Sequence, residues 1–154
     1  MRIALFEPDI AANVGTIIRL GACMGVAIDV IEPCGFPFGD ASMKRAGLDY
    51  LPHASVVRHA SWRAFQASRS GRLILATTKA CQSYAEFRYS VDDTLLFGRE
   101  SAGVTPAVVE VADASVGIPM VQGLRSLNVA VAAGMILGEA LRQTGGSPTT
   151  ERRQ

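Results

Sequence analysis

Three polar clusters in the sequence could bind a ligand or help to move a proton. The first spans 13–19, where the free amides of a helix start could hold an anion and Arg19 could grip a phosphate. The second spans 98–103, where two glycines let a ligand approach the backbone and Glu100 can orient a donor. The third joins 118–120 to 125–128, where polar side chains and unpaired amides open a helix.

Each cluster also has an ordinary structural interpretation. A capped helix with one solvated arginine would explain the first, and a strand-to-helix turn would explain the second. N-capping by Ser126 would explain the third. A binding site therefore requires elements that bring the three clusters to one place.

Apolar runs alternate with helical segments along the chain. Strands are expected at 3–6, 27–31, 55–58, 73–77, 94–97 and 115–118. Helices are expected at 13–24 with Asn13 as cap, at 42–48, after Ser61, after Thr105, and from Ser126 to about 142. This alternation predicts an α/β fold, a mostly parallel sheet with helices on both faces. Ligands of such sheets bind beyond the carboxyl ends of the strands, where the clusters are expected.

The composition limits the remaining possibilities. With 154 residues, 49% hydrophobic and 19% charged, the chain is expected to form one folded domain over 1–146 with a flexible tail at 147–154. No apolar run is long enough for a membrane span, and three scattered cysteines favour a reduced, cytoplasmic compartment. Of fifteen cations all but Lys44 and Lys79 are arginines, which suits phosphate binding but also fits the codon bias of a GC-rich genome.

Several familiar sites are missing from the sequence. No G-x-G-x-x-G follows a predicted strand, and there is no P-loop lysine motif. His53 and His59 are the only histidines and lie apart from any cysteine pair, so neither a zinc site nor a histidine triad is expected.

The three clusters in their order, N-x-G-x-x-x-R, L-x-F-G-x-E-x-x-G and I-P-M followed by R-S-L-N, resemble the SPOUT or α/β-knot methyltransferases. The chain from Arg2 to Gln143 is most similar to the subgroup of tRNA (cytidine/uridine-34-2′-O)-methyltransferases. The resemblance implies S-adenosylmethionine as methyl donor, tRNA as substrate with the ribose of nucleotide 34 as acceptor, a homodimer, and a C-terminal trefoil knot. It implies no metal.

The resemblance also assigns roles to individual positions. Donor-binding positions are Ala76, Gly98, Ile118, Met120, Ser126 and Leu127. Catalytic positions are Arg19, Glu100, Ser126 and Asn128. Because arginine is a poor general base, we expect Arg19 to grip a phosphate beside the target ribose, while a phosphate oxygen or a water takes the proton. Further RNA contacts are expected from Arg45, Arg58, Arg63, Arg99 and Arg142.

Two positions depart from the subgroup and leave alternatives open. Arg99 stands where a proline is common, and Gly138 stands where a tyrosine is common. The alternatives are a SPOUT enzyme that methylates another RNA position or a base nitrogen, and a non-catalytic RNA-binding dimer. The repeat of Ala130, Gly134 and Gly138 fits either a core helix or a subunit interface.

Overall fold

The computed structural model describes residues 1–38 and 48–149 of the chain. Its strands are β1 (Arg2–Phe6), β2 (Ala27–Ile31), β3 (Val56–His59), β4 (Leu73–Ala76), β5 (Thr94–Phe97) and β6 (Ala114–Val116). Its helices are α1 (Ala11–Met24), the 3-10 helix η1 (Leu48–His53), α3 (Trp62–Ser68), α4 (Pro106–Glu110) and α5 (Val129–Thr144). All six predicted strands are present, whereas nearly all of the helix predicted at 42–48 lies outside the described residues.

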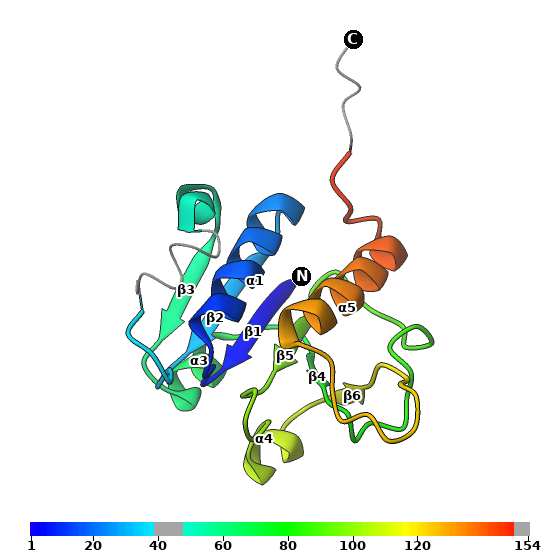
Figure 1. Cartoon of the computed structure of the whole chain (residues 1–154). Helices are drawn as coiled ribbons and strands as arrows, with labels where there is room; N and C mark the ends of the chain where they lie inside the picture. Colours follow the sequence, from blue (N-terminus) through cyan, green and yellow to red (C-terminus); the bar gives the residue numbers. More distant parts are fainter. Residues whose placement is uncertain (39–47, 150–154) are drawn as a thin grey trace.

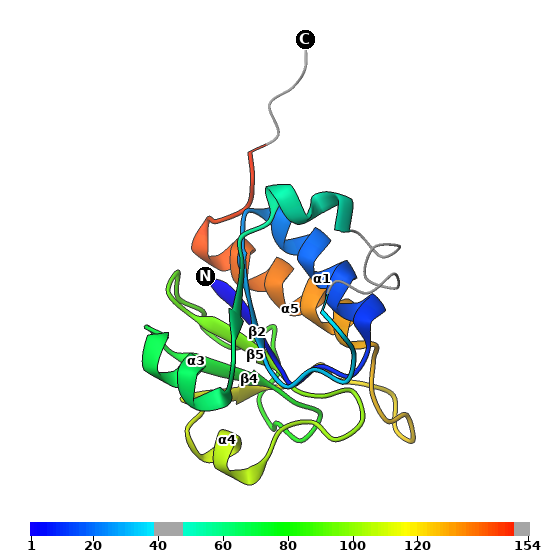
Figure 2. The same ribbon diagram turned by 90° about the vertical axis from the view of Figure 1, so that its left-hand side faces the viewer.

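The six strands form one parallel sheet in the order β3-β2-β1-β5-β4-β6 (Figure 1). Helices α1 and α5 cover one face, and α3 and α4 lie on the other (Figure 2). This confirms the predicted parallel sheet with helices on both faces. Because all strands run the same way, the loops that follow β1, β4, β5 and β6 emerge at a common edge.

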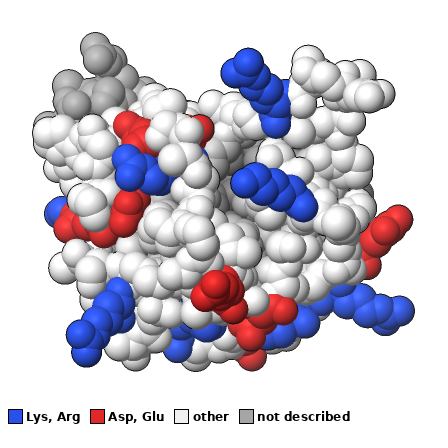
Figure 3. All heavy atoms as spheres, turned by 90° about the horizontal axis from the view of Figure 1, so that it is seen from below, with Lys and Arg blue, Asp and Glu red and all other residues white. Residues whose placement is uncertain are grey.

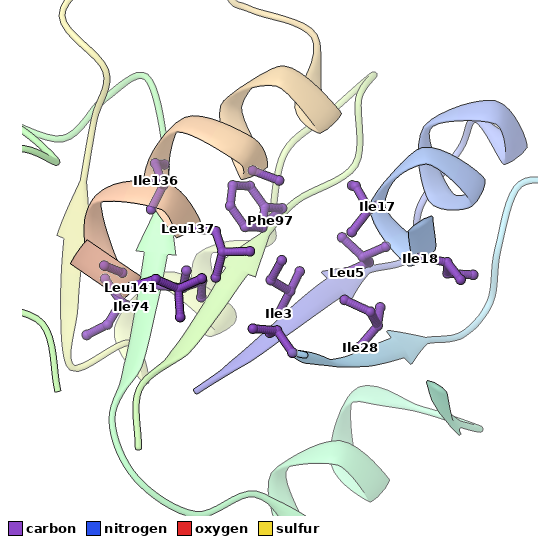
Figure 4. Close-up of a cluster of buried hydrophobic side chains, with 14 of the residues drawn as sticks. Ile3, Leu5, Ile17, Ile18, Ile28, Ile74, Phe97, Ile136, Leu137 and Leu141 are labelled. Carbon is purple, nitrogen blue, oxygen red and sulfur yellow. The ribbon is translucent and has the colours of Figure 1, made fainter. Parts of the chain in front are cut away.

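The core divides into two layers, one on each side of the sheet. Figure 4 shows the larger layer, where Ile3 and Leu5 of β1 point toward Ile17 of α1 and Phe97 of β5 lies near Leu137 of α5. The alternate residues of the strands point the other way and pack with α3 and α4; they include Ala4, Phe6, Leu75, Leu96, Phe65 and Val108. Apolar side chains on both faces of the strands are what a covered parallel sheet requires.

Two buried aspartates stabilise the sheet away from its carboxyl edge. The carboxylate of Asp29 accepts hydrogen bonds from Arg2 Nε at 2.6 Å and Nη2 at 2.8 Å, and lies 2.8 Å from His59 Nε2. Asp93, just before β5, forms a similar bidentate pair with Arg72, whose Nε and Nη2 each donate to a carboxylate oxygen at 2.8 Å. Each buried charge is therefore paired, as burial of a carboxylate requires.

The ends of the helices were predicted with mixed success. Gly25 and Gly145 end α1 and α5 with φ of 67° and 68°, and the hydroxyl of Ser61 caps α3 by accepting from Ala64 N, as expected. The cap predicted at Asn13 is wrong, because α1 begins at Ala11 and Asn13 is buried inside it.

The cap predicted for the last helix is wrong as well. Its cap is Asn128, whose Oδ1 accepts from the N–H groups of Ala130 and Val131, and Ser126 lies outside the helix. Among the described residues, no helix is both long and apolar enough to cross a membrane.

Candidate functional site

A cavity of about 580 Å³ opens beyond the carboxyl ends of β4, β5 and β6. Its volume lies in the range of roughly 300–1,000 Å³ that is usual for small-molecule sites. Figure 3 views this end of the molecule and shows a hollow with Lys or Arg side chains beside it. The cavity therefore lies where a parallel sheet is expected to bind a ligand.

The structure brings nearly all the predicted site residues to this cavity. All six predicted donor-binding positions line it: Ala76, Gly98, Ile118, Met120, Ser126 and Leu127. Glu100 and Asn128 line it too, so three of the four predicted catalytic positions are here. These residues come from the ends of three strands and the start of α5, so only the fold makes them neighbours.

The turn at 98–103 forms one wall of the cavity, and its glycines are needed to close it. The N–H of Arg99 donates to Gly103 O at 2.9 Å, and the N–H of Gly103 donates to Arg99 O at 2.8 Å. A Cβ on Gly98 would lie 2.6 Å from the carbonyl carbon of Gly103, and Gly103 itself has φ of 68°. Larger residues at either position would distort this wall.

A chain of hydrogen bonds ties three of the surrounding elements together. Glu100 Oε2 accepts from the N–H of Asp9 at 2.8 Å, and its Oε1 accepts from Asn13 Nδ2 at 2.9 Å. Asn13 Oδ1 then accepts from Asn128 Nδ2 at 2.9 Å, and Asn128 Oδ1 caps α5. Both carboxylate oxygens of Glu100 are thus occupied by protein donors, which makes this residue a fixed part of the wall.

Asn13 has a different role in this hydrogen-bond network from the helix cap that its sequence position predicts. It is only 8% exposed, and its amide donates to Glu100 and accepts from Asn128. A buried asparagine on an otherwise apolar helix face was the available signal, because such a side chain needs partners from elsewhere in the fold.

The cavity wall offers main-chain polar groups within an apolar surround. Within residues 1–38 and 48–149, no protein group accepts a hydrogen bond from the N–H groups of Ile118, Met120 and Leu127. Apolar side chains such as Phe97 and Ile136 line the same space. This donor set fits a ligand that combines an aromatic ring with polar edges. The described residues contain no group of three or more His, Cys, Asp or Glu side chains that could hold a metal ion.

Of the described arginines that were predicted to contact RNA, Arg99 alone lines the cavity. Arg19 lies outside the cavity, exposed on α1, where its guanidinium stacks on Tyr50 at 4.6 Å from the ring centre and donates to Tyr50 Oη at 3.3 Å. Arg99 lines the cavity but is held by Glu7 and Asp9, and these carboxylates, Asp9 foremost, raise its pKa. Arg125, which lines the cavity with Lys79, was not among the predicted RNA contacts.

The remaining predicted RNA contacts lie away from the cavity. Arg58 pairs with Glu32 and stacks on Phe38, and Arg142 pairs with Glu139 on α5. Arg63 is exposed on α3, and Arg45 lies outside the described residues.

Comparisons with known proteins agree with this geometry. A tRNA (cytidine(34)-2′-O)-methyltransferase of Ancylobacter novellus is 53% identical over 97% of both chains. One of Escherichia coli (strain K12) is 39% identical over 94% of both.

Solved structures give the same result. A structure described as giving structural insights into the 2-OH methylation of C/U34 on tRNA superposes with a TM-score of 0.88 at 37% identity, covering 92% of this chain and 94% of that one. The SpoU methyltransferase AviRb from Streptomyces viridochromogenes, in complex with AdoMet, has a TM-score of 0.84 at 27% identity, covering 93% of this chain and 60% of that one.

A family model settles the relationship. The resemblance drawn from the three ordered motifs is confirmed by a match that runs over residues 1–138, most of the chain and all three clusters of the site. The chain belongs to the SpoU rRNA Methylase family.

Proposed function

We propose that this chain transfers the methyl group of S-adenosylmethionine to the ribose 2′-hydroxyl of nucleotide 34 of tRNA, a cytidine or modified uridine. The observation that carries the proposal is the cavity at the carboxyl edge of the sheet, lined by every predicted donor-binding position. Identity of 53% over nearly the whole chain to a tRNA (cytidine(34)-2′-O)-methyltransferase supports this substrate.

The cavity walls suit the methyl donor. The N–H groups of Ile118, Met120 and Leu127 would hold the polar edges of its adenosine, and Gly98 lets the turn close tightly against Gly103 to complete the wall. When bound, S-adenosylmethionine supplies an electrophilic methyl carbon attached to a positively charged sulfur. Holding the hydroxyl in line with that carbon is the main task of the protein, and such positioning can lower a barrier by about 7–11 kcal/mol.

The proton of the hydroxyl has no acceptor among the fixed wall groups. Both oxygens of Glu100 already accept hydrogen bonds, so using Glu100 as a base would break the contact with Asp9 or with Asn13. A guanidinium has no acceptor atom, so Arg19 would bind a phosphate rather than take the proton. A phosphate oxygen or a water therefore takes the proton, and Arg19 sets the position of the ribose through the neighbouring phosphate.

The position of Arg19 supports a homodimer. Since it lies outside the cavity of its own chain, the partner subunit's Arg19 would serve that cavity. Large apolar side chains are left exposed on the loop before α5 and along its outer face, and they form what we name the apolar stripe: Leu124, Leu127, Val131 and Met135. An exposed apolar surface of this kind is typical of a subunit interface. For the helix that carries Gly138, we therefore favour a subunit interface over a purely core position.

Binding of tRNA would rest on arginines from both subunits. Arg63 is exposed on α3, and Arg125 and Lys79 both line the cavity. Phosphate contacts of this kind release counterions, so affinity for tRNA should fall steeply as salt rises. An affinity that is equal at low and moderate salt would count against this surface.

We also propose that the C-terminal part of the chain forms a trefoil knot. Strand β6 lies at one edge of the sheet, whereas α5 packs against α1 near the middle of the sheet. The segment at 117–128 must therefore cross the carboxyl edge between them, as a knotted connection would. An experimental chain trace in which this segment passes through no loop would refute the knot.

Two experiments test the proposed function. Mass spectrometry of tRNA from a deletion strain should show loss of 2′-O-methylation at nucleotide 34 alone. Loss at another RNA position or at a base nitrogen would favour the other enzyme class, and intact methylation would favour a non-catalytic RNA-binding dimer.

The second experiment separates binding from turnover with Arg19→Ala. The variant should bind S-adenosylmethionine like the unmodified chain but lose turnover, because Arg19 lies outside the cavity and its loss removes the proposed contact with the substrate phosphate. Lost donor affinity with unchanged single-turnover chemistry would refute this role.

A further inference from the structure

The loop after β1 and the turn at 98–103 hold each other through reciprocal hydrogen bonds, an arrangement that we name the clasp. Asp9 Oδ1 accepts from Arg99 Nε at 3.2 Å and from Nη2 at 2.9 Å. Asp9 Oδ2 accepts from the N–H of Ser101 at 3.1 Å and from the Ser101 hydroxyl. In the opposite direction, the N–H of Asp9 donates to Glu100. One aspartate thus contacts three successive residues of the cavity wall.

The Asp9 side of the clasp is itself held firmly. The N–H of Gly35 donates to Pro8 O at 2.9 Å, and a Cβ on Gly35 would lie 3.1 Å from the Asp9 Cα, so the two loops are in close contact. Glu7 has φ of 44°, a conformation that non-glycine residues rarely adopt and that costs free energy. Strain of this kind persists where surrounding contacts hold the backbone in place. Here the backbone at Glu7 turns so that Asp9 faces the turn at 98–103.

The turn has little else to hold it. Among the described residues, its other hydrogen bonds are the link from Glu100 to Asn13, one from Arg99 Nη1 to Glu7 Oε2 at 3.3 Å, and the two between Arg99 and Gly103. Ser101, Ala102 and Gly103 are exposed and bury no side chain in the core. Without the clasp, the turn would therefore sample positions in which the cavity wall is incomplete.

We propose that Asp9 is a positioning residue that keeps the turn at 98–103 in the form that binds the methyl donor. The proposal rests on the proposed function, and it adds a residue that touches neither donor nor substrate. If only a fraction of molecules has a complete wall, the apparent affinity for the donor falls by that fraction. Once the donor is bound the wall is complete again, so the rate at saturation is unaffected. The clasp therefore acts on KM for the donor and not on kcat.

The test compares Asp9→Asn with a matched control, Asp113→Asn. In Asp9→Asn, the new amide NH2 faces a donor of Arg99 or Ser101 whichever way it is turned, so part of the clasp is lost. Asp113 likewise accepts from one main-chain N–H, that of Leu73 at 2.7 Å, and lies 3.8 Å from an arginine, but it does not line the cavity. It therefore reports the general cost of removing a carboxylate.

Calorimetry with S-adenosylhomocysteine gives the first measurement. We expect Asp9→Asn to weaken binding about tenfold and to raise KM for S-adenosylmethionine by the same factor, with kcat at saturating donor unchanged. Asp113→Asn should leave donor binding unchanged. Ser101→Ala, a change at an exposed position, should give a smaller increase in both constants.

The outcomes distinguish the two proposals. If the unmodified chain binds S-adenosylhomocysteine but Asp9→Asn and Ser101→Ala bind it equally well, the clasp proposal is refuted and the proposed function stands. A fall in kcat at saturating donor with KM unchanged would also refute the clasp. If the unmodified chain does not bind the compound at all, both proposals fail.

Discussion

Replacing Asn13 by alanine would break the hydrogen-bond chain in its middle. The side chain is buried, and it is the only described link between Glu100 and Asn128. Its removal leaves one oxygen of Glu100 and the amide of Asn128 without their partner. The consequence should appear in stability even before activity is measured.

The expected loss follows from the two hydrogen bonds. A bond to a charged carboxylate contributes about 1.5–3 kcal/mol, and one between neutral amides about 0.5–1.5 kcal/mol. Alanine recovers up to roughly 0.7 kcal/mol through its higher helix propensity. The free energy of unfolding should therefore fall by about 2.5 kcal/mol, which corresponds to a Tm lower by about 5–10 °C for a chain of this size.

The assay is denaturant and thermal unfolding at one fixed protein concentration, because a dimer makes Tm depend on concentration. Thr16→Ala is the control: among the described residues its hydroxyl bonds to Ala12 O within the same helix, so its effect should stay below about 0.5 kcal/mol. Combined with Glu100→Gln, Asn13→Ala should show a coupling of about 1 kcal/mol. Additivity within about 0.5 kcal/mol would refute the connection.

Three further predictions address the cap, the interface and the pH dependence. Asn128→Ala should lower the free energy of unfolding by at least about 1 kcal/mol through loss of the helix cap, whereas Ser126→Ala should leave the thermal transition unchanged; equal effects would contradict the assigned cap. Met135→Asp, which places a charge in the apolar stripe, should give monomers in sedimentation analysis and abolish methylation; an active monomer would contradict the shared site. Hydrogen bonding from Arg142 lowers the pKa of Glu139 to about 2, so this carboxylate stabilises the fold above its unfolded pKa and the contribution is lost as the pH falls toward 2. Glu139→Gln should therefore show a flatter loss of stability in acid titrations, and an unchanged pH profile would refute this.

The sheet could be predicted from the sequence because its signals are local. Runs such as 73–76 and 94–97 are apolar on both faces, and that pattern alone favours a covered parallel strand. Gly25 and Gly145 end their helices because they adopt a left-handed conformation that other residues disfavour. Such features depend only on residues close together in the chain.

The errors occurred where distant contacts decide. Asn13, Ser126 and Asn128 are all good capping residues, so local sequence could not rank them. The fold decides between them, because the amides of Asn13 and Asn128 bond to each other across α1 and α5. The role of Arg99 was hidden for the same reason, since its partners Glu7 and Asp9 are about ninety residues away in sequence.

The convergence of the site was expected from the order of the motifs and the rule for parallel sheets, but its hydrogen-bond chain was not. Glu100 could be selected as a site residue, yet nothing in the sequence shows that both of its oxygens are occupied. Pairings of this kind depend on how three separate loops meet, which only the assembled sheet determines.

The pairing of Asp29 with Arg2 and of Asp93 with Arg72 has a consequence for how such an enzyme can diversify. Neither aspartate nor its partner lines the cavity, so the scaffold is stabilised by groups that do not take part in recognition. Mutations in the loops at the opposite edge can then accumulate without unfolding the sheet. Related proteins with the same sheet and ion pairs could therefore modify different RNAs.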